Sequence, residues 1–207
     1  GAGTRCCKRW ISAPTPSASR ARRFKSSPAN CSPASVSIRT DFTGGKGYIE
    51  KDWGVSMPSS WIWMQTNHFD REGVSLSGSI AKIPWFGSYF TGYIFGFLYD
   101  KKLYKFTAYS GAKVTLLDVT ADNTRIRLEN KTYRLDIDAD RSKGVDLPAP
   151  KLGEMTAKVN ESLNSSINVD LLKKKGSGTE LIYSGTGRNA GLEFVGNITE
   201  LIKGLKK

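Results

Sequence analysis

Residues 125–138 read RIRLENKTYRLDID, and this stretch decides the fold class. Apolar and polar residues alternate on both sides of a short turn at Asn130 and Lys131. Strict alternation predicts a strand with one buried and one solvated face, and two such runs joined by a turn predict an antiparallel hairpin. The side chains expected on its buried face are Ile126, Leu128, Tyr133, Leu135 and Ile137.

Short alternating segments separated by turn residues continue through most of the chain from Thr43 onward. Further strands are predicted near residues 45–51, 60–69, 75–83, 89–99, 102–109, 112–119, 166–173, 179–184 and 191–195. Helix is favoured only near 154–163 and near 197–206, where Asn197 is the candidate N-cap. Many short strands and few helices predict an all-β protein, an antiparallel barrel or sandwich, and a large barrel can enclose a ligand cavity.

Residues 1–40 differ in composition from residues 41–207, which are expected to form the folded domain. The first forty residues carry eight of the 31 Lys and Arg residues, no acidic residue, and four of the eight prolines. Such a segment buries too little apolar surface to offset the entropy of ordering, so we expect it to be disordered. An organellar transit peptide has this composition, and a fragment boundary or an out-of-frame translation is the alternative.

The net charge and the positions of the cysteine and histidine residues restrict the functions expected of the folded part. Residues 1–40 supply eight of the twelve net positive charges, so the domain is only mildly basic and is not expected to bind nucleic acid. All three cysteines also lie there, and His68 is the only histidine, so no metal site is expected in the domain. Residues 185–190 formally match a dinucleotide fingerprint, but strand-like residues follow, and we interpret them as a hairpin turn. No apolar run approaches the about twenty residues of a membrane helix.

Residues 60–69 hold the most informative strand. Alternation places two indoles and two amides on one face, which is unusual for a dry core because buried amides need hydrogen-bond partners. Aromatic side chains with a few polar groups are usual in a ligand pocket. Two interpretations remain open: this face lines a ligand pocket, or the indoles close the barrel and the amides hold neighbouring loops. The face comprises Trp61, Trp63, Gln65, Asn67 and Phe69.

Two other segments carry candidate functional side chains. Tyr48, Glu50 and Asp52 are expected on one strand face, with Trp53 on the other. The two carboxylates could act as a general acid and its electrostatic partner, although their spacing alone favours ordinary surface ion pairs. In residues 93–99 an aromatic stripe that begins with Tyr93 faces one side and apolar residues face the other, so both faces are expected to be buried.

The segments YIEKDWG at 48–54, Pro58 and WIWMQTNHF at 61–69 together resemble the central motif of the tocopherol cyclase family and its bacterial relatives. Later pieces follow in the order such proteins show: IAKIPW at 80–85, FTGYIFGFLYDKKLYKFTAYSGAK at 90–113, LPAP at 147–150 and GTGRNAGLEFVG at 185–196. The resemblance covers about residues 41–196 and corresponds to the C-terminal half of such a protein. Family members usually carry a further β half before this motif, which residues 1–40 do not resemble.

The resemblance implies a lipocalin-like, calycin-type β-barrel and the acid-catalysed closure of a phytyl benzoquinol to a chromanol, without cofactor or metal. Glu50 is the first candidate for the acid, and Asp52, less typical of the plant enzymes, is the second. Aromatic faces can stabilise the cationic intermediate, while Gln65 and Asn67 can hold the quinol hydroxyls. The substrate-binding residues expected on this basis are Tyr48, Trp53, Trp61, Trp63, Gln65, Asn67 and Tyr93.

Two other classes of function remain open at the level of sequence. The same barrel could carry an apolar prenyl quinol or lipid without turning it over, because fold does not settle function. A nucleic-acid role through residues 1–40 is disfavoured, since that segment has almost no aromatic residues to stack on bases. Peripheral membrane contact is compatible with an apolar ligand. The compartment expected is the cytoplasm for a bacterial source and the plastid for a photosynthetic eukaryote.

Overall fold

A computed structural model describes residues 41, 43–44, 47–50, 57–151 and 153–205. The chain divides into two units, residues 7–52 and the remainder, and each is described by itself. Within the first unit, residues 47–50 are not a strand, so that part of the strand predicted at 45–51 is wrong. The predicted disorder of residues 1–40 falls outside the described residues and stays a prediction.

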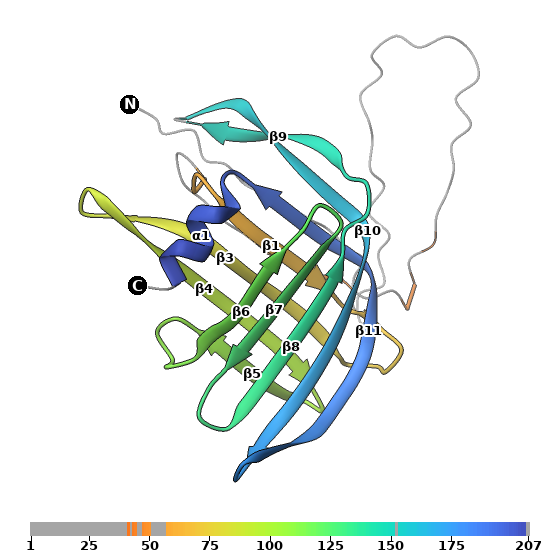
Figure 1. Cartoon of the computed structure of the whole chain (residues 1–207). Coiled ribbons are helices and arrows are strands. Elements are labelled where there is room, and N and C mark those ends of the chain that lie inside the picture. The colour runs from red at the N-terminus through yellow and green to blue at the C-terminus, as the bar shows by residue number, and fades with distance from the viewer. Residues whose placement is uncertain (1–40, 42, 45–46, 51–56, 152, 206–207) are drawn as a thin grey trace. The chain divides into compact units, whose positions relative to one another are not determined.

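The described part of the second unit is an antiparallel β-structure with one short C-terminal helix (Figure 1). Its sheet runs in the order β5-β4-β3-β1-β11-β10-β8-β7-β6, with β2 paired to β11 and β9 paired to β10. This confirms the predicted all-β antiparallel class. The elements are β1 (Trp61–Thr66), β2 (His68–Phe69), β3 (Ser75–Trp85), β4 (Ser88–Tyr99), β5 (Lys102–Thr107), β6 (Lys113–Val119), β7 (Asn123–Glu129), β8 (Tyr133–Asp140), β9 (Val145–Lys151), β10 (Glu154–Lys175), β11 (Gly178–Val195) and α1 (Ile198–Leu205).

The sheet curls, so that β6, β7 and β8 lie over β1, β3 and β4 (Figure 1), but it remains open. Its edge strands in the described ranges, β5 and β6, do not pair with each other, so the closed barrel of the prediction is not shown. Side chains partly bridge the gap instead. Lys102 on β5 donates a hydrogen bond to the Tyr133 hydroxyl of β8 at 2.8 Å, and the Tyr93 hydroxyl of β4 donates to the carbonyl of Ala112 at 2.6 Å.

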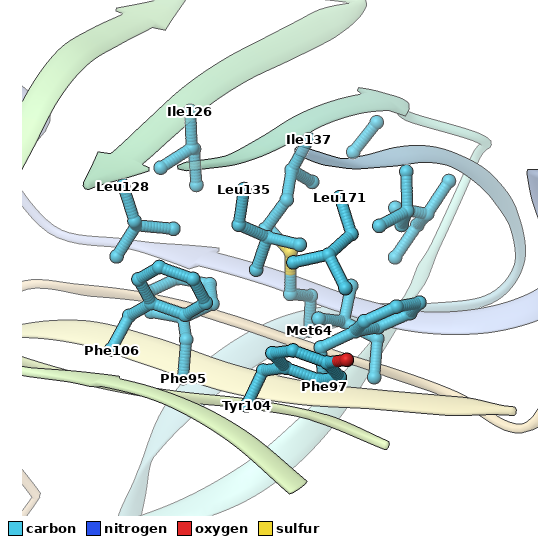
Figure 2. Packing of buried hydrophobic residues seen from close by; sticks show 14 of the residues in the cluster. Met64, Phe95, Phe97, Tyr104, Phe106, Ile126, Leu128, Leu135, Ile137 and Leu171 are labelled. Atoms are coloured by element: carbon cyan, nitrogen blue, oxygen red, sulfur yellow. The ribbon is translucent and has the colours of Figure 1, made fainter. Parts of the chain in front are cut away.

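The space inside the curl is filled by apolar side chains from both layers (Figure 2). Leu128 and Leu135 of the β7–β8 hairpin are fully buried, as are Phe97 and Phe106 of β4 and β5. Because each layer turns its alternate residues inward, the two layers share one core. The labelled residues are Met64, Phe95, Phe97, Tyr104, Phe106, Ile126, Leu128, Leu135, Ile137 and Leu171.

The β7–β8 hairpin has the strands and the turn that the sequence predicted. Glu129 is opposite Arg134 at the last pair of the ladder, and the turn between them is closed by the Asn130 side chain. The Asn130 side-chain oxygen accepts hydrogen bonds from the backbone N–H groups of Thr132 at 2.9 Å and Tyr133 at 2.7 Å. The amide side chain thus satisfies the turn backbone locally, as Asn commonly does.

Two predictions about the long C-terminal strands are wrong. Residues 154–163, predicted as a helix, form the first part of β10, and residues 185–190, predicted as a turn, lie inside β11. The start of β10 is a strand because it pairs with β9, an element the sequence pattern did not indicate, with Val159 opposite Leu147. Strand pairing of this kind is a tertiary contact, so a local pattern cannot reveal it.

The predicted C-terminal helix is confirmed as α1. The Asn197 side-chain oxygen accepts the backbone N–H of Thr199 at 3.1 Å, so Asn197 caps the helix as predicted. Leu201 is buried against the sheet, and the Thr91 hydroxyl of β4 donates to its carbonyl at 3.0 Å. No helix within the described ranges is long and apolar enough to span a membrane.

Candidate functional site

Strand β1 separates its predicted site residues from the core. Ile62 and Met64 are fully buried on the face that joins the apolar core. Trp61 and Trp63 lie on the opposite face, where they belong to a second apolar cluster. Since alternate residues of a strand point to opposite sides, the indoles and the core side chains occupy different sides of the same sheet. The two indoles share a face, as the sequence predicted.

The predicted single face of residues 60–69 breaks at Asn67. The Thr66 hydroxyl donates to the carbonyl of Arg188 at 2.9 Å and accepts the N–H of His68 at 3.2 Å. These bonds interrupt the alternation between β1 and β2, and Phe69 joins the core rather than the indole face. The placement of Phe69 with the indoles is therefore wrong. Gln65 remains on the indole side of β1, and both it and Asn67 are half-buried.

Trp61 is held by a buried carboxylate that sequence reasoning missed. The indole N–H of Trp61 donates to the carboxylate of Glu193 on β11 at 2.8 Å, and Glu193 is only 3% exposed. In the ladder between the two strands Glu193 is opposite Trp63. Glu193 thus lies among the predicted indoles, with its carboxylate fixed in orientation by one of them.

A second carboxylate adjoins the first. Glu161 on β10 is directly opposite Glu193 in the β10–β11 ladder and is 1% exposed. Residues directly opposite in an antiparallel pair have Cβ atoms about 4.5–5.5 Å apart and project to the same face. We call the four residues Trp61, Trp63, Glu161 and Glu193 the Trp–Glu cluster. It places two carboxyl groups and two indoles on neighbouring strands of one sheet face.

Small apolar side chains surround the Trp–Glu cluster. β9 and the first part of β10 contribute Ala149 and Val159, both buried against Trp61. A water-poor wall of this kind weakens solvent screening and strengthens electrostatic interactions inside it. The partly buried neighbours of this wall are Met57, Trp63, Ala81, Ala157 and Val195.

A serine network follows Glu161 where β10 becomes irregular. The register with β11 shifts between Ser162 and Ser165, and bulges of this kind are frequent beside functional sites. Ser165 donates to the Ser162 hydroxyl at 2.9 Å, and the backbone N–H of Ser142 donates to Ser165 at 3.2 Å. The Ser142 and Ser162 hydroxyls are also hydrogen-bonded to each other. The network holds the strand next to Glu161 in a defined conformation.

The upstream acids belong to the other unit. The hydroxyl of Tyr48 donates to the carboxylate of Glu50, and both side chains are half-buried. Asp52 and Trp53 lie outside the described residues, so the predicted face of Tyr48, Glu50 and Asp52 is described only for its first two members. Their catalytic and binding roles stay predictions.

Tyr93 does not join the Trp–Glu cluster. It packs against the apolar core on the inner side of β4, and burial raises the pKa of its hydroxyl above the ordinary 10.0. The next residue, Ile94, is exposed on the outer side, so the expectation that both faces of this strand are buried is wrong. The structure therefore groups Trp61 with Trp63 and leaves Tyr93 on the opposite side of the sheet.

Sequence reasoning missed Glu161 and Glu193 for different reasons. Glu161 lay in the segment predicted as a helix, where it looked like an ordinary solvated residue. Glu193 lies in the strand predicted near residues 191–195, where it alternates with Leu192 and Phe194, and it was not singled out as a candidate. The usable signal was its position in a short apolar strand. Within the described ranges no three His, Cys, Asp or Glu side chains gather as metal ligands would.

Comparisons with known proteins match the chain to one family model and to the two plant proteins named below. A family model described as tocopherol cyclase-like matches residues 36–196. Over 166 residues the chain is 25% identical to a protein of Oryza sativa subsp. japonica named "Probable tocopherol cyclase, chloroplastic" and 26% identical to one of Zea mays named "Tocopherol cyclase, chloroplastic". Each match covers 76% of this chain and 35% of the relative, so the matched part spans about a third of the relatives' length. No solved structure matches the chain.

Proposed function

Because the chain belongs to the tocopherol cyclase-like family, we propose that it catalyses acid-assisted ring closure of a prenylated benzoquinol to a chromanol. The observation that carries the proposal is the pair of buried carboxyl groups, Glu161 and Glu193, beside two indoles. Both acids lie within the matched residues 36–196. The phytyl chain of the substrate is implied by the family resemblance alone, and for this chain it is part of the proposal.

The reaction needs an acid, a protected cation and a base. A carboxylic acid transfers its proton to the trisubstituted alkene of the prenyl tail, which leaves a tertiary carbocation. The phenolic oxygen attacks that carbon and closes the ring, and the phenolic proton then passes to a carboxylate. Atoms and electrons balance, so the conversion is an isomerisation and consumes no oxidant or reductant. Folding the tail over the ring before the proton transfer supplies effective molarity.

Each member of the Trp–Glu cluster has a role in this scheme. One of the two carboxyl groups donates the proton and the other accepts the phenolic proton, because the two residues are directly opposite each other and project to the same face. The faces of Trp61 and Trp63 stabilise the cation by about 0.5–2 kcal/mol each. Trp63 and Gln65 are partly exposed on this side, and we propose that the substrate enters along them. Gln65 and Asn67 are the proposed partners of the quinol hydroxyls.

Glu50 remains an independent candidate for the proton donor. It stands in the motif that carries the family resemblance, and Tyr48 hydrogen-bonds its carboxylate. Asp52 is the second candidate of that motif. The two proposals differ in which unit supplies the acid, and this difference can be tested by changing one carboxyl group at a time.

The test is the turnover of a phytyl benzoquinol by the parent chain and by three single variants, Glu161→Gln, Glu193→Gln and Glu50→Gln. Glutamine keeps the volume and a hydrogen-bonding group but cannot donate the proton. Loss of a general acid lowers turnover by roughly 10²–10⁴-fold, and we expect this loss for Glu161→Gln or Glu193→Gln with the ligand affinity retained. Glu129→Gln, a change at a partly exposed carboxylate on β7, is the matched control and should be neutral.

Three outcomes separate the alternatives. Parental turnover in both cluster variants together with a large loss in Glu50→Gln would assign the acid to the upstream motif. A parent chain that quenches its tryptophan fluorescence on quinol binding but shows no turnover would support the non-catalytic carrier. A parent that neither binds nor converts the quinol would contradict both.

A further inference from the structure

The hairpin of β3 and β4 projects beyond the rest of the sheet (Figure 1). Strand β1 pairs with β3 only as far as Ala81, and β5 pairs with β4 only as far as Ile94. β3 and β4 nevertheless stay paired with each other up to Trp85 and Ser88. The outer part of this hairpin is therefore a two-stranded ribbon without a neighbouring strand on either edge in the described part of the chain.

The tip of this ribbon carries large aromatic side chains in the open. Phe86 is 91% exposed and Trp85 is 61% exposed, and Phe90 is exposed beside them. The Trp85 ring meets the Phe86 and Phe90 rings edge to face, with centroids 4.9 Å and 6.1 Å apart. A contiguous group of exposed aromatic residues marks an interaction site far better than a single exposed apolar residue does. We call Trp85, Phe86 and Phe90 the aromatic tip.

The backbone keeps the aromatic tip exposed. Phe86 and Gly87 form the two-residue loop and have φ angles of 41° and 76°, both in the left-handed region. A hairpin turn with two positive φ angles suits glycine and asparagine, whereas a bulky residue there is strained. Strain of this kind is retained where the conformation serves a function. Here it turns the Phe86 ring outward.

Helix α1 braces the ribbon from one side. The Thr91 hydroxyl of β4 hydrogen-bonds the carbonyl of Leu201, and Lys82 of β3 forms an ion pair with Glu200. An isolated two-stranded ribbon is marginal in water, so these contacts hold the projecting part in place. The aromatic tip is thus a fixed feature of the described structure.

The β3–β4 hairpin has no acidic residue of its own, and Glu200 of the neighbouring helix α1 is paired with Lys82. From Val74 to Tyr99 the sequence contains no Asp or Glu, and its only charged residue is Lys82. The last turn of the bracing helix carries Lys203. Basic residues next to an exposed aromatic group complement an anionic surface that has an apolar layer beneath it.

We propose that the aromatic tip docks this protein onto an anionic lipid membrane by entering the interfacial layer. Trp and other aromatic side chains favour that layer, where an apolar ring contacts the acyl chains and polar edges remain hydrated. A narrow projecting tip suits insertion between lipids, whereas protein interfaces usually need a broader complementary surface. This inference does not depend on the cyclase proposal, although docking would bring the protein to membrane-dissolved prenyl quinols.

Vesicle binding tests the proposal with the full chain. The parent is expected to bind vesicles of phosphatidylcholine mixed with phosphatidylglycerol and to bind phosphatidylcholine alone more weakly. The double variant Trp85→Ser with Phe86→Ser should bind the mixed vesicles about tenfold more weakly or worse, because two apolar rings no longer enter the lipid. Tyr109→Ser is the matched control, since Tyr109 is an aromatic residue on another turn and is 82% exposed. It should bind as the parent does.

Further measurements make each outcome decisive. The single variant Phe86→Ser changes an almost fully exposed position and is the control for misfolding. It should weaken vesicle binding while its melting temperature stays that of the parent. Quenching by brominated lipids should fall when Trp85 is replaced by phenylalanine. Parental vesicle binding in the double variant, or no binding by the parent, overturns the proposal. Loss of self-association in the double variant with unchanged vesicle binding would assign the tip to contact with a second copy instead.

Discussion

The two faces of β1 differ in burial and in chemistry: the inner residues are buried, whereas on the outer face Trp61 is buried and Trp63 and Gln65 are partly exposed. On the inner face Ile62 and Met64 join a core made almost wholly of apolar side chains. On the outer face Trp61 contacts a buried carboxylate, and Glu161 is opposite that carboxylate on the next strand. The inner face is suited to stability, because apolar burial needs no specific partner. The outer face is suited to chemistry, because buried carboxyl groups are costly unless they are held in place.

Mutations on the two faces of β1 should therefore affect different properties of the protein. Removing an inner side chain leaves a cavity, and its cost appears in the free energy of unfolding. Changing an outer carboxylate to its amide should leave folding nearly intact and alter proton transfer. The largest effects on stability are therefore expected inside the curl and the largest effects on turnover outside it.

The largest stability effect is expected for Phe97→Ala. Phe97 is fully buried on β4 and belongs to the apolar core between the layers shown in Figure 2. Truncating a buried phenylalanine costs about 3–5 kcal/mol. Urea unfolding followed by circular dichroism measures the loss, with Ile94→Ala on the exposed side of the same strand as the control. A loss below about 1 kcal/mol for Phe97→Ala would show that the two layers do not share a tight core.

A smaller effect is expected when the buried hydrogen bond of the outer face is broken. Glu193→Leu leaves the Trp61 N–H without its acceptor, and an unsatisfied buried donor costs about 1–3 kcal/mol. Glu193→Gln keeps an oxygen that can accept the same hydrogen bond, so it should be much less destabilising. Urea unfolding of the two variants, measured side by side, checks the difference. Equal stability in both variants would mean that the bond does not order the Trp–Glu cluster.

The smallest effect is expected for Glu129, a partly exposed counterpart of Glu193. Glu129 of β7 accepts a hydrogen bond from Lys174, and this contact lowers the pKa of Glu129 below the ordinary 4.5. Because its folded pKa is the lower one, its stabilisation is present above about pH 4.5 and is lost as the pH falls through the folded pKa. Lys174→Met should cost less than about 1 kcal/mol at pH 7.

The pH dependence distinguishes this pair from general acid unfolding. The difference in unfolding free energy between the parent and Lys174→Met should shrink as the pH is lowered from 7 to below the folded pKa of Glu129, since both proteins then carry a neutral carboxyl group. Unfolding in urea at a series of pH values measures it. A difference that stays constant with pH would assign the effect to packing of the lysine stem.

Local pattern was sufficient for the β7–β8 hairpin and for α1. In both cases the deciding interactions are close in sequence: Asn130 caps its own turn, and Asn197 caps its own helix. Local pattern failed for residues 154–163, because their state depends on pairing with β9. It also failed at Asn67, where the Thr66 hydroxyl bonds to Arg188, a residue distant in sequence.

For the candidate site, the sequence by itself determined that Trp61 and Trp63 share one strand face, because alternation along a strand is a property of the backbone alone. It also indicated the family, through motifs spread over residues 48–196. Only the tertiary structure decided that this face lies outside the curl and that Glu161 and Glu193 meet there. Which side of a strand becomes the interior depends on how the sheet curls and which distant strands pair, and neither is encoded within one strand.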